Sequence, residues 1–73
     1  MGQARMTDNE LLDRITIDPK VMVGKPVIRG TRLTVDYIMG RLAHGATENE
    51  ILEEHDYLSS ADIHACIQTI ARR

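Results

Sequence analysis

The residues best suited to chemistry in this chain are the cations around one glycine, in the run Lys25-Pro26-Val27-Ile28-Arg29-Gly30-Thr31-Arg32. A guanidinium pairs bidentately with a carboxylate, so Lys25, Arg29 and Arg32 are our candidates for contacting an acidic partner protein. Arg72 and Arg73 at the C-terminus are further candidates. The alternative interpretation is a tight strand-to-helix bend at Gly30 whose arginines are merely solvated.

The histidines and the single cysteine show no spacing typical of a metal site or a nucleophile. His44, His55 and His64 are 11 and 9 residues apart, without a short-range pair. His64 and Cys66 are two positions apart on an expected helix, so their side chains diverge. We therefore expect no metal, no cofactor and no catalytic residue, and we expect that the protein is not an enzyme. Cys66 is expected to be a small buried hydrophobic side chain.

A second candidate site is the last helix, where one face carries small and polar residues. Ile63, Ile67 and Ile70 form an apolar stripe, and we expect the opposite face to point outward. The residues on and beside that face, our candidates for contacting DNA, are Ala61, His64, Ala65, Gln68, Thr69 and Arg72. Gln68 could pair with adenine, and Arg72 with guanine or a phosphate.

These side chains must be positioned by short strands and helices, whose ends are clearly marked in the sequence. Ile15-Thr16-Ile17-Asp18 and Val27-Ile28 are typical of two short strands. Three helices should follow, with N-caps at Thr34, Thr47 and Ser59. They are expected to end near Gly45, near His55-Asp56 and at the C-terminus.

The fold class we expect is mainly α, a three-helix helix-turn-helix (homeodomain-like) bundle with a short N-terminal β-hairpin or arm. A three-helix packing without a DNA-binding role is the alternative. Residues 1–13 are expected to be a flexible segment, and residues 14–73 a single domain. The expected core consists of Ile38, Leu42, Ile51, Leu58, Ile63 and Ile67.

Size and composition restrict the setting of this domain. With 73 residues and one cysteine, the chain has a small core and cannot form an internal disulfide. We therefore expect a reducing, cytoplasmic location and a homodimer formed through the N-terminal arm. We find no secretion signal and no stretch long enough to span a membrane, so no membrane association is expected. The natural chain is expected to start at Met1 or at Met6.

Charge is segregated along the sequence, although the net charge is only −2. Residues 14–41 hold six Lys or Arg and two Asp, whereas residues 42–62 hold six Asp or Glu and no Lys or Arg. Such segregation favours a molecule with one basic and one acidic region. The acids around the second helix weaken the DNA interpretation, because they would lie near phosphates in a groove-docked domain.

The run Gly24 to Val35, Gly-Lys-Pro-Val-Ile-Arg-Gly-Thr-Arg-Leu-Thr-Val, resembles the small prokaryotic family called domain of unknown function 433. The segments 14–19, 45–52 and 58–63 resemble its opening strand and its later helix starts, so the likeness covers about residues 14–71. Tyr57 stands where the family usually has proline, which bears on the shape of the last turn.

The resemblance implies a helix-turn-helix-like fold and a role as the antitoxin of a type II toxin–antitoxin pair. The implied partner is a PIN-like ribonuclease toxin, and such antitoxins often bind their operator DNA as well. We accordingly expect an antitoxin. The alternative is a stand-alone DNA-binding regulator without a toxin.

Overall fold

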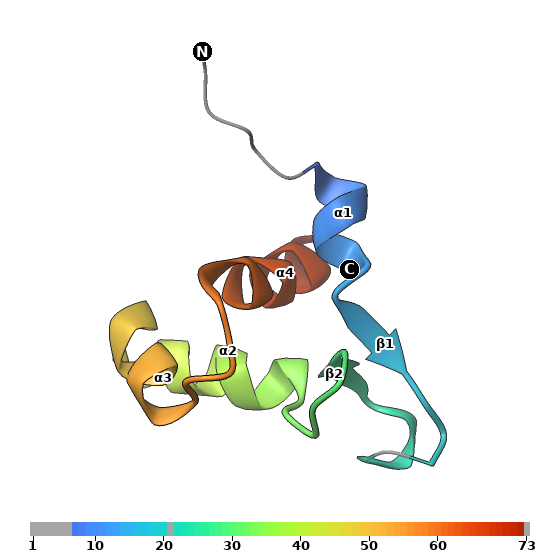
Figure 1. Cartoon of the computed structure of the whole chain (residues 1–73), viewed down its shortest axis with the longest axis horizontal. Coiled ribbons are helices and arrows are strands. Elements are labelled where there is room, and N and C mark those ends of the chain that lie inside the picture. Colours follow the sequence, from blue (N-terminus) through green and yellow to red (C-terminus); the bar gives the residue numbers. More distant parts are fainter. Residues whose placement is uncertain (1–6, 21, 73) are drawn as a thin grey trace.

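The computed structural model describes residues 7–20 and 22–72, and in this part of the chain four α-helices accompany one two-stranded antiparallel sheet (Figure 1). The mainly helical fold with an N-terminal β-hairpin confirms the expected class at this level. In chain order the elements are α1 (Asp8–Leu12), β1 (Ile15–Ile17), the 3-10 turn η1 (Met22–Gly24), β2 (Pro26–Ile28), α2 (Val35–Ala43), α3 (Glu48–Glu54) and α4 (Ser60–Ala71). None of the described helices is long and apolar enough to cross a membrane.

The two strands lie where the β-branched residues predicted them. Ile15 faces Ile28, and Ile17 faces Pro26, in an antiparallel register. On the other side of β2, an isolated bridge joins Val27 to Thr34, so β2 has a neighbour on both edges. β1 therefore forms an outer edge of the sheet.

The predicted helix ends are confirmed by their capping bonds. The Thr34 hydroxyl accepts a hydrogen bond from the Tyr37 backbone N–H at 2.9 Å and so begins α2. At α3 the Thr47 hydroxyl accepts from the Glu50 N–H, and the Glu50 carboxylate accepts from the Thr47 N–H at 2.8 Å. Gly45 follows α2 with φ +97°, a conformation that favours glycine and stops the helix.

The hydrophobic core lies where α2, α3, α4 and β2 meet. The buried cluster consists of Ile28, Val35, Ile38, Ile51, Leu58, Ile63 and Cys66. Leu42 is partly buried against this cluster. The expectation of a shared core is thus confirmed for most of its members, but it is wrong for Ile67, whose side chain is 42% exposed.

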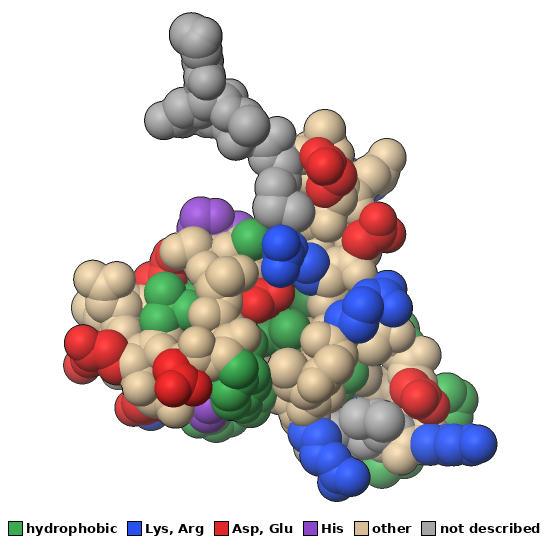
Figure 2. Space-filling view, viewed as in Figure 1, with side chains coloured by type: hydrophobic (Ala, Val, Ile, Leu, Met, Phe, Trp, Pro, Cys, Tyr) green, Lys and Arg blue, Asp and Glu red, His purple; other side chains and the backbone are tan. Residues whose placement is uncertain are grey.

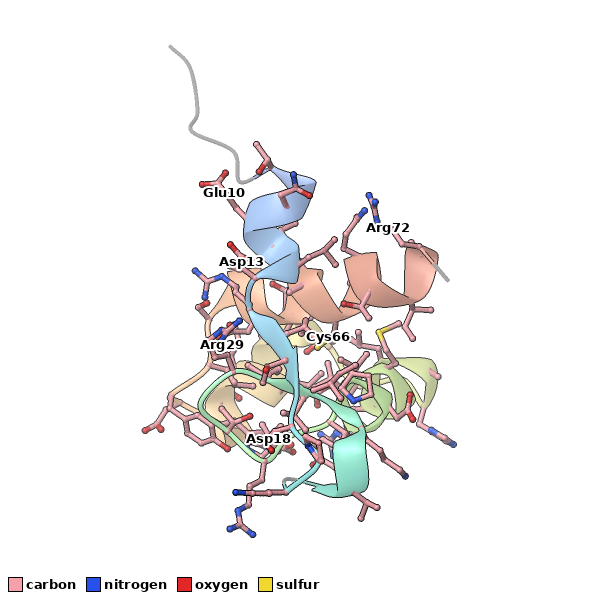
Figure 3. The ribbon with its side chains drawn as sticks, turned by 90° about the vertical axis from the view of Figure 1, so that its right-hand side faces the viewer. Glu10, Asp13, Asp18, Arg29, Cys66 and Arg72 are labelled. Carbon is pink, nitrogen blue, oxygen red and sulfur yellow. The ribbon has the colours of Figure 1, made fainter. Side chains whose placement is uncertain are left out.

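The N-terminal segment corrects a second expectation. Residues 1–6 lie outside the described part of the chain, but Asp8–Leu12 form α1, capped by Thr7, rather than a flexible extension. α1 packs against α4, and in Figures 1 and 3 the two helices lie in contact at one end of the molecule. The ordered domain therefore begins before residue 14.

Candidate partner-binding surface

The face of α4 expected to read DNA is largely covered. Ala65 is completely buried, so it cannot contact a base in this fold. Ala61, Gln68 and Thr69 are half-buried, and the Thr69 hydroxyl donates to the Ala65 carbonyl oxygen at 2.8 Å. Only His64 and Arg72 of the expected set are exposed. Figure 3 places Arg72 at the end of α4, away from Arg29.

α4 packs against α1 and β1 as well as against α2 and α3, so more than one side of this helix is buried. Asp62 begins one of these sides: its carboxylate accepts from the Ser59 backbone N–H at 3.0 Å and pairs with Arg14 Nη1 at 3.0 Å. Ala65 lies one turn further on the same side of the helix. Burial of Asp62, Ala65 and Cys66 displaces the solvent-facing side of α4 toward Ile67, which explains why that isoleucine is exposed.

The exposed stripe of α4 has little to attract a polyanion. It consists of Ser60, His64, Ile67 and Ala71. His64 Nε2 lies 3.3 Å from the Glu48 carboxylate of α3, so an acid is adjacent to the centre of the stripe. A phosphate approaching this face would therefore meet negative charge.

The Arg29-Gly30 segment is a tight turn held by its own hydrogen bonds. The Ile28 carbonyl oxygen accepts from the Thr31 backbone N–H at 2.9 Å and from the Thr31 hydroxyl at 2.8 Å. Gly30 occupies the third position of this turn with φ +80°, as a type II turn favours. The Leu33 N–H then donates to the Thr31 hydroxyl at 3.0 Å, which leads the chain into the α2 cap.

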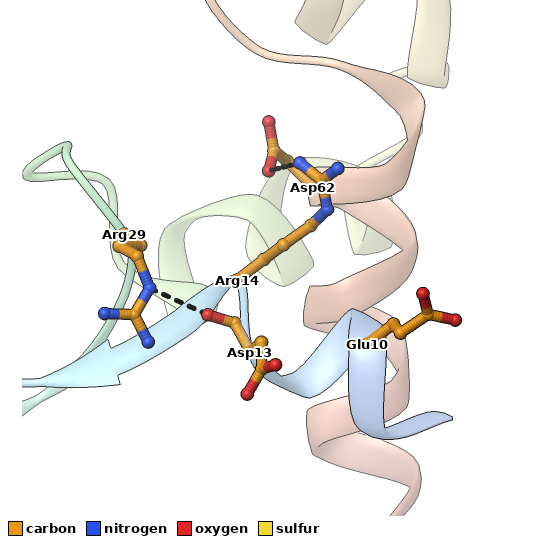
Figure 4. Close-up of a pocket in the computed structure, with 5 residues that line it drawn as sticks. All are labelled: Glu10, Asp13, Arg14, Arg29 and Asp62. Atoms are coloured by element: carbon orange, nitrogen blue, oxygen red, sulfur yellow. Dashed lines mark hydrogen bonds and ion pairs between the residues drawn. The ribbon is translucent and has the colours of Figure 1, made fainter. Parts of the chain in front are cut away.

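Arg29 is fixed at its base and presents its end to solvent. Its backbone N–H donates to the Arg14 carbonyl oxygen at 2.7 Å, and its Nε donates to the Asp13 carbonyl oxygen at 2.8 Å. Figure 4 shows the guanidinium at the rim of an open cavity of about 410 Å³, which Glu10, Asp13, Arg14 and Asp62 also line. Within the described chain, Arg29 forms no ion pair.

Arg32 and Lys25 are also exposed, but the structure does not gather them into one site with Arg29. Arg32 lines a different open depression of about 650 Å³, on the other side of the turn, together with Asp18, Thr31 and Tyr57. Lys25 precedes β2, whereas Arg29 follows it. The three cations therefore form a broad basic surface along β2 and its turn, which we call the β2 surface, rather than a single pocket.

The segregation of charge along the sequence persists in three dimensions. In Figure 2 most Lys and Arg side chains lie on the half of the molecule that holds the sheet, with one acidic side chain among them, while further Asp and Glu lie at the opposite end, over α3, and on α1. Arg41 of α2 is paired with Glu54 at 2.8 Å, so this basic residue is already used within the domain.

The pair of Arg14 and Asp62 was not recognised as such from the sequence. The capping position of Asp62 after Ser59 was visible, but its ion partner lies 48 residues earlier.

Burial, together with the charge of Asp62, raises the pKa of the Cys66 thiol to about 12, which agrees with the expected inert role of that residue. The described residues contain no group of three or more potential metal ligands.

The fold and this surface define a small, mainly helical domain that carries a β-hairpin and a basic turn. The family model described as "Protein of unknown function (DUF433)" matches residues 15–68, and the chain belongs to this family. The matched region includes both strands and the turn at Gly30, but it begins after α1.

One solved structure and one curated protein are similar to this chain. The fold is similar to the crystal structure of a DUF433 member protein from Anabaena variabilis, with a TM-score of 0.81 and 28% sequence identity. That similarity covers 89% of this chain but only 64% of the Anabaena chain, so this chain spans under two thirds of its length. An uncharacterized protein of Archaeoglobus fulgidus is 64% identical over 25 residues, which are 34% of this chain and 69% of that protein.

Proposed function

We propose that this protein is a non-enzymatic, cytoplasmic antitoxin that binds a PIN-like ribonuclease toxin through the β2 surface. The observation that carries the proposal is the fixed orientation of Arg29. Its Nε is held by the Asp13 carbonyl oxygen, while the terminal nitrogens remain at a solvent-open rim. The type of toxin comes from the family resemblance, and the docking surface comes from the geometry.

The chemistry of the proposed partner complements this surface. A metal-dependent nuclease gathers carboxylates in its active site, and a guanidinium can pair with a carboxylate through two parallel hydrogen bonds. Because Arg29 is already immobilised at its base, less side-chain entropy is lost on binding. Arg32 and Lys25 extend positive charge along the rest of the β2 surface and would favour rapid encounter with an acidic partner.

We further infer that α2, α3 and α4 correspond to the helix-turn-helix unit, with residues 55–59 as its turn. This order of helices supports the alternative function, a DNA-binding regulator without a toxin. The burial of Ala65 and the position of Glu48 beside His64 weigh against reading DNA through α4. DNA binding is therefore the secondary proposal, and it would need contacts other than the expected face.

Co-expression with the protein encoded by the adjacent gene tests the antitoxin proposal. Rescue of growth and co-purification of the two proteins are expected, and the complex should weaken as salt is raised. Arg32→Glu should reduce the affinity at least tenfold, since this side chain makes no hydrogen bond or ion pair within the described chain. Arg29→Ala should also weaken binding, with its thermal stability measured in parallel because Arg29 supports the fold.

Arg41→Ala is the matched control, because Arg41 is an arginine at the other end of the domain with an internal partner, Glu54. The affinity of the Arg41→Ala variant for the adjacent gene product should remain within about twofold of that of the natural chain. No rescue by the natural chain would overturn the antitoxin proposal. Full affinity in both Arg29→Ala and Arg32→Glu would instead overturn the assignment of the docking surface. If the chain does not rescue growth but binds its operator DNA tightly and in a salt-dependent way, the alternative function, a DNA-binding regulator without a toxin, would be favoured.

A further inference from the structure

The outer edge of β1 carries backbone groups that the chain's own sheet leaves unused. The bond from the Arg29 N–H to the Arg14 carbonyl oxygen makes this pair a hydrogen-bonded one. Hydrogen-bonded and non-hydrogen-bonded pairs alternate along an antiparallel ladder, so Ile15 and Ile17 occupy non-hydrogen-bonded positions opposite β2. Pro26, which faces Ile17, agrees with this because it has no N–H to donate.

The N–H and C=O groups of Ile15 and Ile17 therefore point away from β2. Among the described residues no further strand pairs with β1, and no backbone hydrogen bond reaches these groups from outside the sheet. Figure 3 shows β1 running across the front of the molecule. The Ile17 side chain is 62% exposed at the end of this strand. A strand edge of this kind is a template for another extended segment.

One symmetric register uses all of these groups. If two copies pair antiparallel about Thr16, Ile15 of each copy faces Ile17 of the other, and both residues exchange N–H···O bonds. A register centred on Ile17 would set Ile15 opposite Pro19, which has no N–H. A register centred on Ile15 would set Ile17 opposite Asp13, whose backbone is helical (φ −62°, ψ −19°) rather than extended.

The same register is favourable for the flanking side chains. Arg14 of each copy, whose Nη1 also binds Asp62 of its own chain, lies opposite Asp18 of the other, so opposite charges flank the central residues on both sides. The exposed Ile17 side chain is covered by the neighbouring Ile15 of the second copy. The product is a four-stranded sheet, whereas a sheet of two short strands is only marginally stable by itself.

We propose that a second copy of this chain pairs along β1, antiparallel, with Thr16 on the two-fold axis. Such a dimer places the two β1 edges in contact and leaves no β1 edge unpaired, which suits a domain with so small a core. The proposal does not depend on the antitoxin function, because it rests on backbone geometry at an edge that the Arg29 and Arg32 side chains do not form.

A disulfide at the axis tests the register directly. In the proposed dimer the two Thr16 residues face each other as a non-hydrogen-bonded pair, with Cα atoms about 4.5 Å apart, within the range that a disulfide spans. Thr16→Cys should therefore form a covalent dimer of the full chain under mild oxidation. Ala43→Cys, at an exposed position of α2, should not do so at the same concentration. The buried Cys66 should leave the natural chain uncross-linked.

A proline at position 17 separates dimerisation from folding. Ile17→Pro removes an N–H that the chain's own sheet does not use, whereas Ile17→Val keeps it. Light scattering should give twice the 8.2 kDa chain mass for the natural chain and the valine variant, and the single mass for the proline variant. The helical circular dichroism signal should be the same in all three.

A natural chain that stays monomeric up to about 100 µM would overturn the proposal, as would a proline variant that stays dimeric. Equal cross-linking of the two cysteine variants would overturn the register. If the natural chain is monomeric and Ile17→Pro abolishes binding to the adjacent gene product, the edge serves a strand of that partner and the second copy is rejected. Because Arg32→Glu should remain dimeric, failure of the dimer and failure of the antitoxin proposal are distinguishable.

Discussion

At the scale of single residues, two glycines with equally open surroundings should respond in opposite ways to the same substitution. Apart from its chain neighbours and, at Gly40, its own helix backbone, a Cβ added at Gly30 or Gly40 would meet no described atom within 4 Å. Gly30, however, has φ +80° in the turn that orients Arg29, whereas Gly40 lies inside α2. The difference between the two positions is thus one of backbone conformation and not of space.

We expect Gly30→Ala to lower the free energy of unfolding by roughly 1–2 kcal/mol, the cost of left-handed backbone for an L-residue. Gly40→Ala should raise it by roughly 0.5–1 kcal/mol, because alanine is the better helix former and loses less backbone entropy. Urea denaturation of both variants checks this pair. Destabilisation by Gly40→Ala would show that α2 meets a close neighbour at this point.

Arg14 and Asp62 show how one ion pair at this scale decides which surface is available. Asp62 is buried and caps α4, and Arg14 leaves the end of α1 to reach it. The two side chains thereby tie the segment that follows α1 to the N-terminal end of α4. A carboxylate and a guanidinium 48 positions apart thus help to determine that this end of α4 is covered.

At the scale of elements, the capping box of α3 links helix stability to pH. The Thr47 backbone N–H and hydroxyl lower the pKa of the Glu50 carboxyl below its ordinary value of 4.5. Since the pKa in the folded state is the lower one, this contribution to stability is fully present above pH 4.5 and is lost as the pH falls through the folded value. The same arrangement occurs at Thr7 and Glu10 of α1.

Glu50→Gln should therefore make the free energy of unfolding less dependent on pH in the acid range, which we call the acid limb of the stability curve. The glutamine can still accept the Thr47 N–H bond but does not titrate, so less stability should be lost as the pH falls below 4.5. Glu53→Gln, at an exposed position of the same helix, is the control and should leave the acid limb as it is. Urea midpoints measured across this range give the answer. Identical acid limbs for Glu50→Gln and the natural chain would contradict the assignment.

At the scale of the whole molecule, α1 is part of the domain although the family match begins after it. Removing residues 1–13 should lower the free energy of unfolding by roughly 1–3 kcal/mol, because the packing of α1 against α4 is lost. The denaturant slope should fall as well, since less surface is buried on folding. Thr7→Ala, which removes only the cap of α1, should cost about 1 kcal/mol or less. An unchanged urea midpoint after the deletion would show that α1 contributes nothing to the fold.

The sequence alone was sufficient for those features that depend on neighbours a few positions away. The caps at Thr34 and Thr47 follow from side chains that satisfy backbone N–H groups three residues on, and the stop at Gly45 follows from its left-handed backbone. The strands, expected at residues 15–18 and 27–28, follow from local runs of β-branched residues. Most of the core followed too, because periodic aliphatic residues face inward whatever covers them. Family membership was likewise available from the run around Gly30.

The tertiary structure alone decided which side of α4 is free and how the cations are distributed. A helix has several sides that can be buried, and the apolar stripe of α4 shows only the side that faces the core cluster. α4 also packs against α1, which the sequence signals only weakly, and in the folded chain Ala65 is buried and Ile67 exposed. Arg29 and Arg32 are three positions apart in sequence, yet the turn between them directs them to different depressions. These outcomes depend on contacts between distant segments, and no local pattern contains them.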